Sequence, residues 1–327
     1  MSPGGTGPMT LAQLGEFALI AELVRDLPEA SDVLVGPGDD GAVLAGDGSV
    51  VVSTDVLVEG VHFRRDWSGP GEIGRKAVAV NVADVEAMGA RPQGVVVGFS
   101  APGDTEVRWT LDLAAGLRAE CATAGVNLLG GDTTRGRDVT LSVTALGTLD
   151  GRPPVRRGGA RPGDVLAVVG RLGWAAAGLL VLGRGFRSPR AVVEVQRVPQ
   201  VPYGQGAVAA RAGATAMVDV SDGLLADLGH VARASGVTID VRTEALEIPE
   251  PLGTVGSATG VDPLLLVLTG GEDHALVATF PPGSVPSGWT TIGEVVEAGP
   301  DGPAVLVDGA PFAGVPGFDH FRPGARR

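Results

Sequence analysis

The chain contains two stretches in which strand and helix patterns alternate, and this alternation most limits what its 327 residues can fold into. Short β-branched or apolar runs predict strands, and apolar residues spaced three or four apart predict helices. In the first half, strands are predicted at 49–54, 94–99, 126–129 and 139–146, with helices at 14–27, 72–88 and 108–124. In the second half, strands are predicted at 164–169, 215–218, 237–241 and 273–280, with helices at 174–182 and 224–234 and a loop-rich link at 184–202. The pattern predicts an α+β chain made of two α/β domains.

A turn-rich break separates the two halves. The run Asp150-Gly151-Arg152-Pro153-Pro154 combines residues that favour turns and interrupt regular structure. The chain is also longer than one ordinary domain. We therefore predict a disordered tail at 1–10, an N-terminal domain at 11–150 and a C-terminal domain at 151–327.

The chain is acidic, with a formal net charge of −13 and a pI near 4.7. Proteins that bind nucleic acid or anionic membranes need a basic face to meet phosphates, so this charge argues against both partners. The longest apolar stretch, around 174–182, is too short to span a bilayer. The single cysteine, Cys121, cannot form an internal disulfide, which is compatible with a reducing compartment. We expect a cytoplasmic protein.

Aspartates recur at the ends of predicted strands and in glycine-rich turns. Carboxylates held there can bind a divalent cation and leave it open on one side, and Mg²⁺ takes one or two of them together with waters and phosphates. The alternative is that Asp-Gly pairs are ordinary turn residues, an explanation that weakens as such sites accumulate. The aspartates of this series are Asp39, Asp40, Asp55, Asp132, Asp219 and Asp222.

Asp84 gives a sharper signal because it is predicted to face a core. It falls on the same apolar stripe of its helix as Ile73 and Val80. An ionised carboxylate in that position is costly unless it is paired or binds a metal. A salt bridge to Arg75 or Lys76 is the alternative, but both lie more than two helical turns away. Metal ligation is the better explanation.

Two glycine-containing segments are candidates for phosphate binding. Residues 130–136, Gly-Gly-Asp-Thr-Thr-Arg-Gly, are predicted to form a loop whose backbone N–H groups and hydroxyls can approach an anion. Ser221-Asp222-Gly223 opens a predicted helix, where Ser221 or Asp222 could cap the helix and the helix end could also attract phosphate. Arg157 could neutralise a transferring phosphoryl group, although a solvated surface arginine explains it nearly as well.

Two common kinase architectures are excluded or disfavoured. No Walker A sequence occurs, and Lys76 is the only lysine, which excludes a P-loop NTPase. The motif set of a protein kinase is also absent. Because the chain itself is acidic, phosphate binding requires an intervening cation, and a divalent metal is the obvious candidate.

Three further candidates give weaker signals. Glu272, in the segment 270–273, could bind substrate or metal, or could belong to a hairpin-like turn. His62 and Phe318 are single residues of types that are more often structural than functional.

The motifs of the chain resemble those of the thiamine-monophosphate kinase family over roughly residues 14–321. The specific parts are the run 53–63, Ser-Thr-Asp-Val-Leu-Val-Glu-Gly-Val-His-Phe, and the segment 130–136. The remaining matches follow in the same order along the chain, at 38–40, 79–84, 87–90, 219–224 and 270–273.

The resemblance implies a fold of the aminoimidazole-ribonucleotide-synthetase-like type. Its N-terminal α/β domain would bind ATP and metal and dimerise through its sheet, and a second α/β domain would follow. It also implies transfer of the ATP γ-phosphate to thiamine monophosphate, giving thiamine diphosphate and ADP, with several Mg²⁺ ions between the two substrates. The implied partners are ATP, thiamine monophosphate and a second copy of the chain.

Roles for individual residues follow from the same resemblance, and no protein nucleophile is among them. The implied metal ligands are Asp40, Ser53, Thr54, Asp55, Asp84, Asp132, Asp219 and Asp222. The residues implied to bind ATP are Gly131, Asp132, Arg157 and Ser221. Those implied to bind thiamine monophosphate are His62, Glu272 and Phe318.

The chain departs from the family pattern at two positions. Gly41 stands where the family often has Cys, and His274 stands where Tyr commonly follows Glu-Asp. We expect neither residue to touch a predicted ligand.

Several alternatives remain at this level. Another ATP-dependent member of the superfamily is one, although the reactive Cys or selenocysteine typical of a selenophosphate synthetase is absent from the N-terminal glycine-rich region. A metal-dependent phosphohydrolase could use the same aspartates to activate water. A non-catalytic metal-binding protein is the third.

Overall fold

The computed structural model describes residues 8–14, 19, 22–23, 25, 31, 33–35, 43–44 and 48–318. Asp39, Asp40 and Gly41, most of the predicted helix 14–27 and most of the predicted tail 1–10 lie outside the described residues. The chain divides into two compact units. The first comprises 52–81, 92–146 and the described part of 1–47, and the second comprises 48–51, 82–91 and 147–318.

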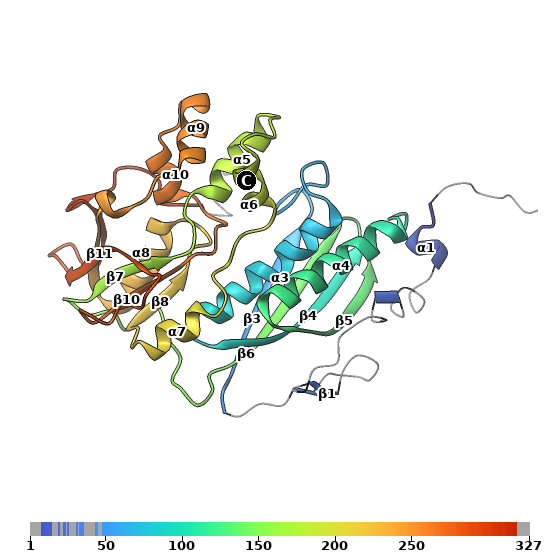
Figure 1. Ribbon diagram of the computed structural model, residues 1–327, viewed down its shortest axis with the longest axis horizontal. Helices are drawn as coiled ribbons and strands as arrows, with labels where there is room; N and C mark the ends of the chain where they lie inside the picture. Colours follow the sequence, from blue (N-terminus) through green and yellow to red (C-terminus); the bar gives the residue numbers. More distant parts are fainter. Residues whose placement is uncertain are drawn as a thin grey trace, which may run out of the picture. The chain divides into compact units, whose positions relative to one another are not determined.

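A four-stranded sheet forms the centre of the first unit. Its order is β3-β6-β4-β5, and β4 and β5 run parallel. Helices α3 and α4 lie side by side along one face of this sheet (Figure 1). The bounds of these elements are β3 (Val50–Val58), α3 (Pro70–Ala87), β4 (Arg91–Ala101), α4 (Val107–Ala124), β5 (Asn127–Arg135) and β6 (Thr140–Thr148). Three short elements precede them, α1 (Leu11–Leu14) and the antiparallel pair β1 (Val33–Val35) and β2 (Val43–Leu44).

Helices α3 and α4 approach each other through glycines. A Cβ atom added to Gly74 would lie 2.2 Å from the carbonyl oxygen of Leu113, and one added to Gly116 would lie 2.1 Å from that of Gly71. Such distances leave no room for a methyl group, so the two backbones are in direct contact.

A seven-stranded sheet of order β13-β12-β9-β11-β7-β10-β8 forms the second unit. Strand β10 pairs antiparallel with both β7 and β8, and each residue of β8 and β10 is buried. The strands are β7 (Val165–Val169), β8 (Ala216–Asp219), β9 (Val237–Val241), β10 (Leu276–Phe280), β11 (Thr290–Glu297), β12 (Val305–Val307) and β13 (Ala310–Pro311). The helices are α5 (Trp174–Gly183), α6 (Arg190–Arg197), α7 (Gln205–Arg211), α8 (Leu224–Ser235), η1 (Thr243–Ala245), α9 (Glu250–Thr259) and α10 (Pro263–Thr269).

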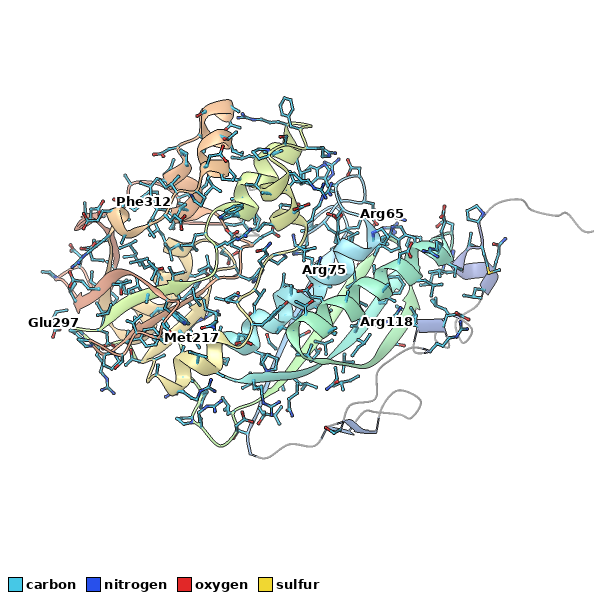
Figure 2. All side chains as sticks on the ribbon, in the orientation of Figure 1. Arg65, Arg75, Arg118, Met217, Glu297 and Phe312 are labelled. Carbon is cyan, nitrogen blue, oxygen red and sulfur yellow. The ribbon has the colours of Figure 1, made fainter. Side chains whose placement is uncertain are left out.

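Aromatic and aliphatic side chains pack the core of this unit. Phe280 and Trp289 meet edge to face, with ring centroids 5.4 Å apart and an interplanar angle of 81°. Met217, labelled in Figure 2, is buried in the same cluster. The Trp289 Nε1–H donates to Oε1 of Gln205 at 3.1 Å, so its polar atom is satisfied.

The structure confirms the predicted α+β class and corrects several elements. The segment predicted as a loop-rich link contains α6, whose buried face of Val192, Val193 and Val195 was not recognised. Residues 130–135 belong to strand β5 and therefore do not form a loop. The boundary near residue 150 stays a prediction.

Among the described residues, no single helix is long and apolar enough to cross a membrane. Helices α9 and α10 together have the required length and composition, but they are bent by 112° relative to each other.

The glycine contact between α3 and α4 predicts a large difference between two Gly→Ala substitutions. We expect Gly116→Ala to lower the free energy of unfolding by about 1–3 kcal/mol, because the methyl group would overlap a carbonyl oxygen. Gly253→Ala in α9 is the control, since open space surrounds it and alanine raises helix propensity by about 1 kcal/mol. Urea denaturation of both variants checks this, and equal stabilities would contradict the close packing.

Candidate functional site

Strand β3 carries the first group of predicted ligands, and helix α3 fixes its backbone. The N–H of Asp55 donates to Oδ1 of Asn81 at 2.8 Å. Asn81 is fully buried, and its Nδ2 donates to the carbonyl of Ala77 at 2.8 Å. Successive side chains of a strand alternate between faces, so Ser53 and Asp55 share one face and Thr54 points to the other. Thr54 Oγ1 donates to a main-chain oxygen of β6 on that other face.

Asp132 lies near the end of strand β5, where its side chain is exposed. The structure explains why glycine occupies the two positions before it. Gly130 has a φ of 144°, and the β4–β5 register shifts beside it. A Cβ on Gly131 would fall 1.9 Å from the carbonyl oxygen of Val97. These glycines allow two strands to meet closely, whereas the sequence alone suggests that they admit a phosphate.

His62 lies in the turn after β3. Its Nδ1 accepts the N–H of Val58 at 3.0 Å, and its carbonyl oxygen accepts from Lys76 Nζ at 3.2 Å. The first contact closes the turn, and the second holds it against α3. Arg75, the other cation considered as a partner of Asp84, bonds Glu120 of α4 at 2.8 Å.

In the second unit, four acidic or basic side chains gather around the end of β8. Nδ1 of His274 lies 2.9 Å from Oδ2 of Asp219, and both residues are buried. Burial lowers the pKa of His274, but the hydrogen bond to Asp219 and the charges of Asp219, Asp84 and Glu272 outweigh it and leave the pKa raised. The predicted ligands Asp84 and Asp219 and the predicted substrate residue Glu272 are therefore close enough to act on one imidazole. The expectation that His274 touches no predicted ligand is wrong.

Asp227 holds the segment that carries Ser221 and Asp222. Its Oδ2 accepts the backbone N–H groups of residues 221, 222 and 223, each at 3.1 Å. Gly223 is the N-cap of α8 and has no side chain, so neither Ser221 nor Asp222, considered as possible caps, occupies the N-cap position. Burial, followed by the charge of Asp219, raises the pKa of Asp227 to about 7. The N–H of Phe318 donates to the carbonyl of Asp222 at 2.9 Å, which places Phe318 beside this segment.

Asp273 anchors the neighbouring segment 270–275. Its carboxylate accepts the N–H groups of Gly173 (2.6 Å) and Ala175 (2.9 Å) and so caps the N-terminus of α5. The segment joins α10 to β10 and is not a hairpin turn. Burial raises the pKa of Asp273 to about 7, although both N–H groups act in the opposite direction.

A cationic group lies beside Asp222. Arg233 Nη2 is 3.1 Å from Nδ1 of His230. Partial burial and the charges of Arg157 and Arg233 lower the pKa of His230, whereas the charge of Asp222 acts in the opposite direction. Ser235 Oγ donates to the carbonyl of Arg157 at 3.2 Å and fixes that loop to the end of α8. Arg157 therefore belongs to a local cluster of positive charge near a predicted metal ligand.

The donor chemistry at these positions fits Mg²⁺. The predicted ligands offer carboxylate and hydroxyl oxygens, which a hard cation prefers, and no thiolate. In the part of the chain that is described, no group of three or more His, Cys, Asp or Glu side chains is arranged to hold a metal by itself. Mg²⁺ usually takes only one or two protein carboxylates, and phosphate and water oxygens complete its shell. A Mg²⁺ site therefore does not require three protein ligands in one cluster.

Sequence reasoning did not identify Asp227, Asp273 and His274 as important. Asp227 carried one usable signal, an acidic residue in the first turn of a helix, which favours contact with free N–H groups. The contacts of Asp273 and His274 join segments about 100 and 55 residues apart, and no local pattern indicates them.

Comparisons with known proteins agree with one another. The family model described as AIR synthase related protein, N-terminal domain, matches residues 38–149, and the model of the C-terminal domain matches residues 161–299. A thiamine-monophosphate kinase of Mycobacterium tuberculosis is 53% identical over 315 residues, covering 95% of this chain and 93% of the relative. The structure of a thiamine-monophosphate kinase from Stenotrophomonas maltophilia has a TM-score of 0.77 and 33% identity, covering 90% of this chain and 95% of that one. The structure of AaThiL complexed with AMPPCP and TMP has a TM-score of 0.75 and 34% identity, covering 96% and 99%.

The pKa of Asp273 predicts how stability depends on pH. Its folded-state pKa of about 7 lies above the ordinary value of 3.8, so the folded chain keeps a proton that the unfolded chain has lost. The contribution of this carboxyl to stability is therefore present below about pH 4 and is lost as pH rises to about 7, by at most about 1.4 kcal/mol per pH unit. Asp273→Asn removes this dependence. Urea denaturation of both proteins at pH 5, 6 and 7 in EDTA checks it, and parallel profiles would contradict it.

Proposed function

The chain belongs to the thiamine-monophosphate kinase family, and we propose that it transfers the γ-phosphate of ATP to thiamine monophosphate, giving thiamine diphosphate and ADP. The observation that carries this proposal is the 53% identity to a thiamine-monophosphate kinase along 95% of the chain. The related AaThiL structure is complexed with AMPPCP and TMP, which supports the same pair of substrates here.

We propose Mg²⁺, in several copies, as the cation of this site. When bound, it would neutralise the charge of two phosphate esters and stabilise the charge on the transferring group. The residues that would hold it are those with suitable oxygen donors or adjacent carbonyls, namely Asp40, Ser53, Thr54, Asp55, Asp84, Asp132, Asp219 and Asp222. For Thr54 the backbone carbonyl is the better candidate, because the hydroxyl is bonded within the sheet.

The protein's part in the transfer is to bind and align. Gly131, Asp132, Arg157 and Ser221 would hold ATP, and the Arg157 guanidinium would neutralise charge on the phosphates. A phosphate monoester has a second pKa near 6, so the acceptor is already ionised near neutral pH and needs no strong general base. In-line geometry and charge neutralisation therefore account for the catalysis, and no protein nucleophile takes part.

His62, Glu272 and Phe318 would hold thiamine monophosphate. Two of them have fixed surroundings that suit such a role. The backbone N–H of Phe318 donates to the carbonyl of Asp222. The backbone N–H of Glu272 donates to the carbonyl of Ser221 at 2.8 Å. His62 closes the turn after β3.

We also propose that the chain is a cytoplasmic homodimer. Strand β3 alternates exposed and less exposed residues, and its exposed positions include Val52 and Val56, 61% and 45% exposed. These apolar side chains lie on one face of β3, and a second copy packing on this sheet would cover them. The lone Cys121 is buried, which is compatible with a reducing compartment.

The dimer predicts a change in molecular mass on substitution of this face. Val56→Glu would place a charge in the proposed interface, and we expect monomers in light scattering coupled to gel filtration. Val315→Glu, at a similarly exposed valine of the second unit, is the control and should leave the mass unchanged. A monomeric wild-type chain would contradict the proposal.

The reaction is tested by incubating purified protein with ATP, Mg²⁺ and thiamine monophosphate. We expect ADP and thiamine diphosphate, whereas release of free phosphate without thiamine diphosphate would indicate a phosphohydrolase and contradict the proposed transfer.

Two substitutions test the metal-assisted mechanism. We expect Asp55→Asn or Asp132→Asn to lower kcat by on the order of 100-fold or more while the melting temperature stays within a few degrees, because the charge on the cation is lost. Asp138→Asn is the matched control, another exposed aspartate close to Asp132 in sequence. Full activity in both site variants would count decisively against the mechanism.

A further inference from the structure

His274 contacts one of the proposed Mg²⁺ ligands through a well-defined hydrogen bond. Its Nδ1 lies 2.9 Å from Oδ2 of Asp219, and the two side chains are 7% and 4% exposed. At this burial little water competes for either group, so the pair forms a defined contact. A carboxylate oxygen accepts, so Nδ1 carries the proton and donates it.

The backbone that carries His274 is fixed on both sides. The N–H of His274 donates to the carbonyl of Val220 at 2.9 Å, and the N–H of Val220 donates to the carbonyl of Ala275 at 2.8 Å. The preceding Asp273 is held by the N-terminus of α5. His274 has a φ of 53°, a left-handed conformation that a residue other than glycine keeps only where its surroundings determine it. The imidazole is therefore placed on Asp219 by a rigid frame.

The imidazole also lies within the electrostatic field of Asp84 and Glu272. Two proposed metal ligands and one proposed substrate residue therefore act on the charge of the imidazole, and one of them, Asp219, is bonded to it. A donor that occupies Oδ2 of Asp219 restricts the rotation of that carboxylate, and Oδ1 is then the oxygen available to a cation. Hydrogen bonds to ligating carboxylates are a recognised way of orienting a metal ligand.

We propose that His274 is a positioning residue for the cation site and orients the Asp219 carboxylate through its Nδ1–H. The inference rests on the proposed function, because it takes Asp219 as a Mg²⁺ ligand. Loss of such a supporting hydrogen bond typically weakens metal binding by about 10–100-fold.

The test compares His274→Asn with His274→Gln. The amide nitrogen of Asn can occupy nearly the place of Nδ1, and Asn tolerates the left-handed backbone, whereas Gln carries its amide one bond further out and cannot donate in the same place. Mn²⁺, as a probe for the Mg²⁺ site, is titrated into the full chain with AMPPCP present, and free Mn²⁺ is measured by electron paramagnetic resonance. We expect an affinity about 10–100-fold weaker for Gln, and within about threefold of wild type for Asn. His274→Ala is a second variant without the donor, in case the Gln variant does not fold.

The outcomes separate positioning from a purely structural role. If the Gln and Ala variants melt at lower temperature but bind Mn²⁺ as the wild type does, His274 is structural and the inference fails. If Asn and Gln weaken Mn²⁺ binding equally, the donor has no role and the inference fails as well. A wild-type chain that binds no Mn²⁺ overturns the proposed metal site and this inference with it. A wild-type chain that binds Mn²⁺ but makes no thiamine diphosphate contradicts only the proposed function, and the variant comparison still decides the role of His274.

Discussion

Buried carboxylates that accept backbone N–H groups hold the segments that carry the candidate ligands of the second unit. Asp227 fixes residues 221–223, and Asp273 fixes the segment before β10 by capping α5. Glu86, at the end of α3 and 1% exposed, does the same for α7 by accepting the N–H groups of Gly204 and Gly206 at 2.7 and 2.8 Å. The N-terminal ends of α5 and α7 thus gain acceptors from distant segments, whereas the N-terminal end of α8 is held by an aspartate of its own first turn.

This arrangement has an energetic cost. Removing a carboxylate from water is unfavourable, and two or three N–H donors offset only part of that cost. The balance appears in the pKa values of Glu86, Asp227 and Asp273, each raised to about 7 with burial as the main cause. In return for this cost the loop is held in place, because a buried carboxylate that accepts two or three hydrogen bonds leaves the loop little conformational freedom. Positioned loops are what metal-assisted phosphoryl transfer requires, because alignment supplies much of its rate.

The fold class followed from the sequence because amphipathic periodicity survives in the longer elements. Helices α3 and α4 and strands β7 to β10 lie within a few residues of their predicted bounds. The sequence predicted the wrong element where local composition suggests one conformation and tertiary packing requires another. Residues 130–135 look like a loop because they are rich in glycine, but the glycines are required by the close approach of β4 to β5. Helix α6 is short and follows several turn-forming residues, so its buried valines were not weighed as a helical face.

From the sequence, only those residues of the candidate site that belong to a recognisable motif could be predicted. Motif matching proposed the aspartates, and the structure brings Asp84, Asp219 and Glu272 within range of one imidazole. Motif matching cannot assess His274, because a residue that departs from a motif has no visible contact partner in the sequence alone. That partner, Asp219, is 55 residues away in the chain and 2.9 Å away in space. A departure from a family pattern is therefore best judged by the atoms it contacts, and here those atoms belong to a proposed ligand.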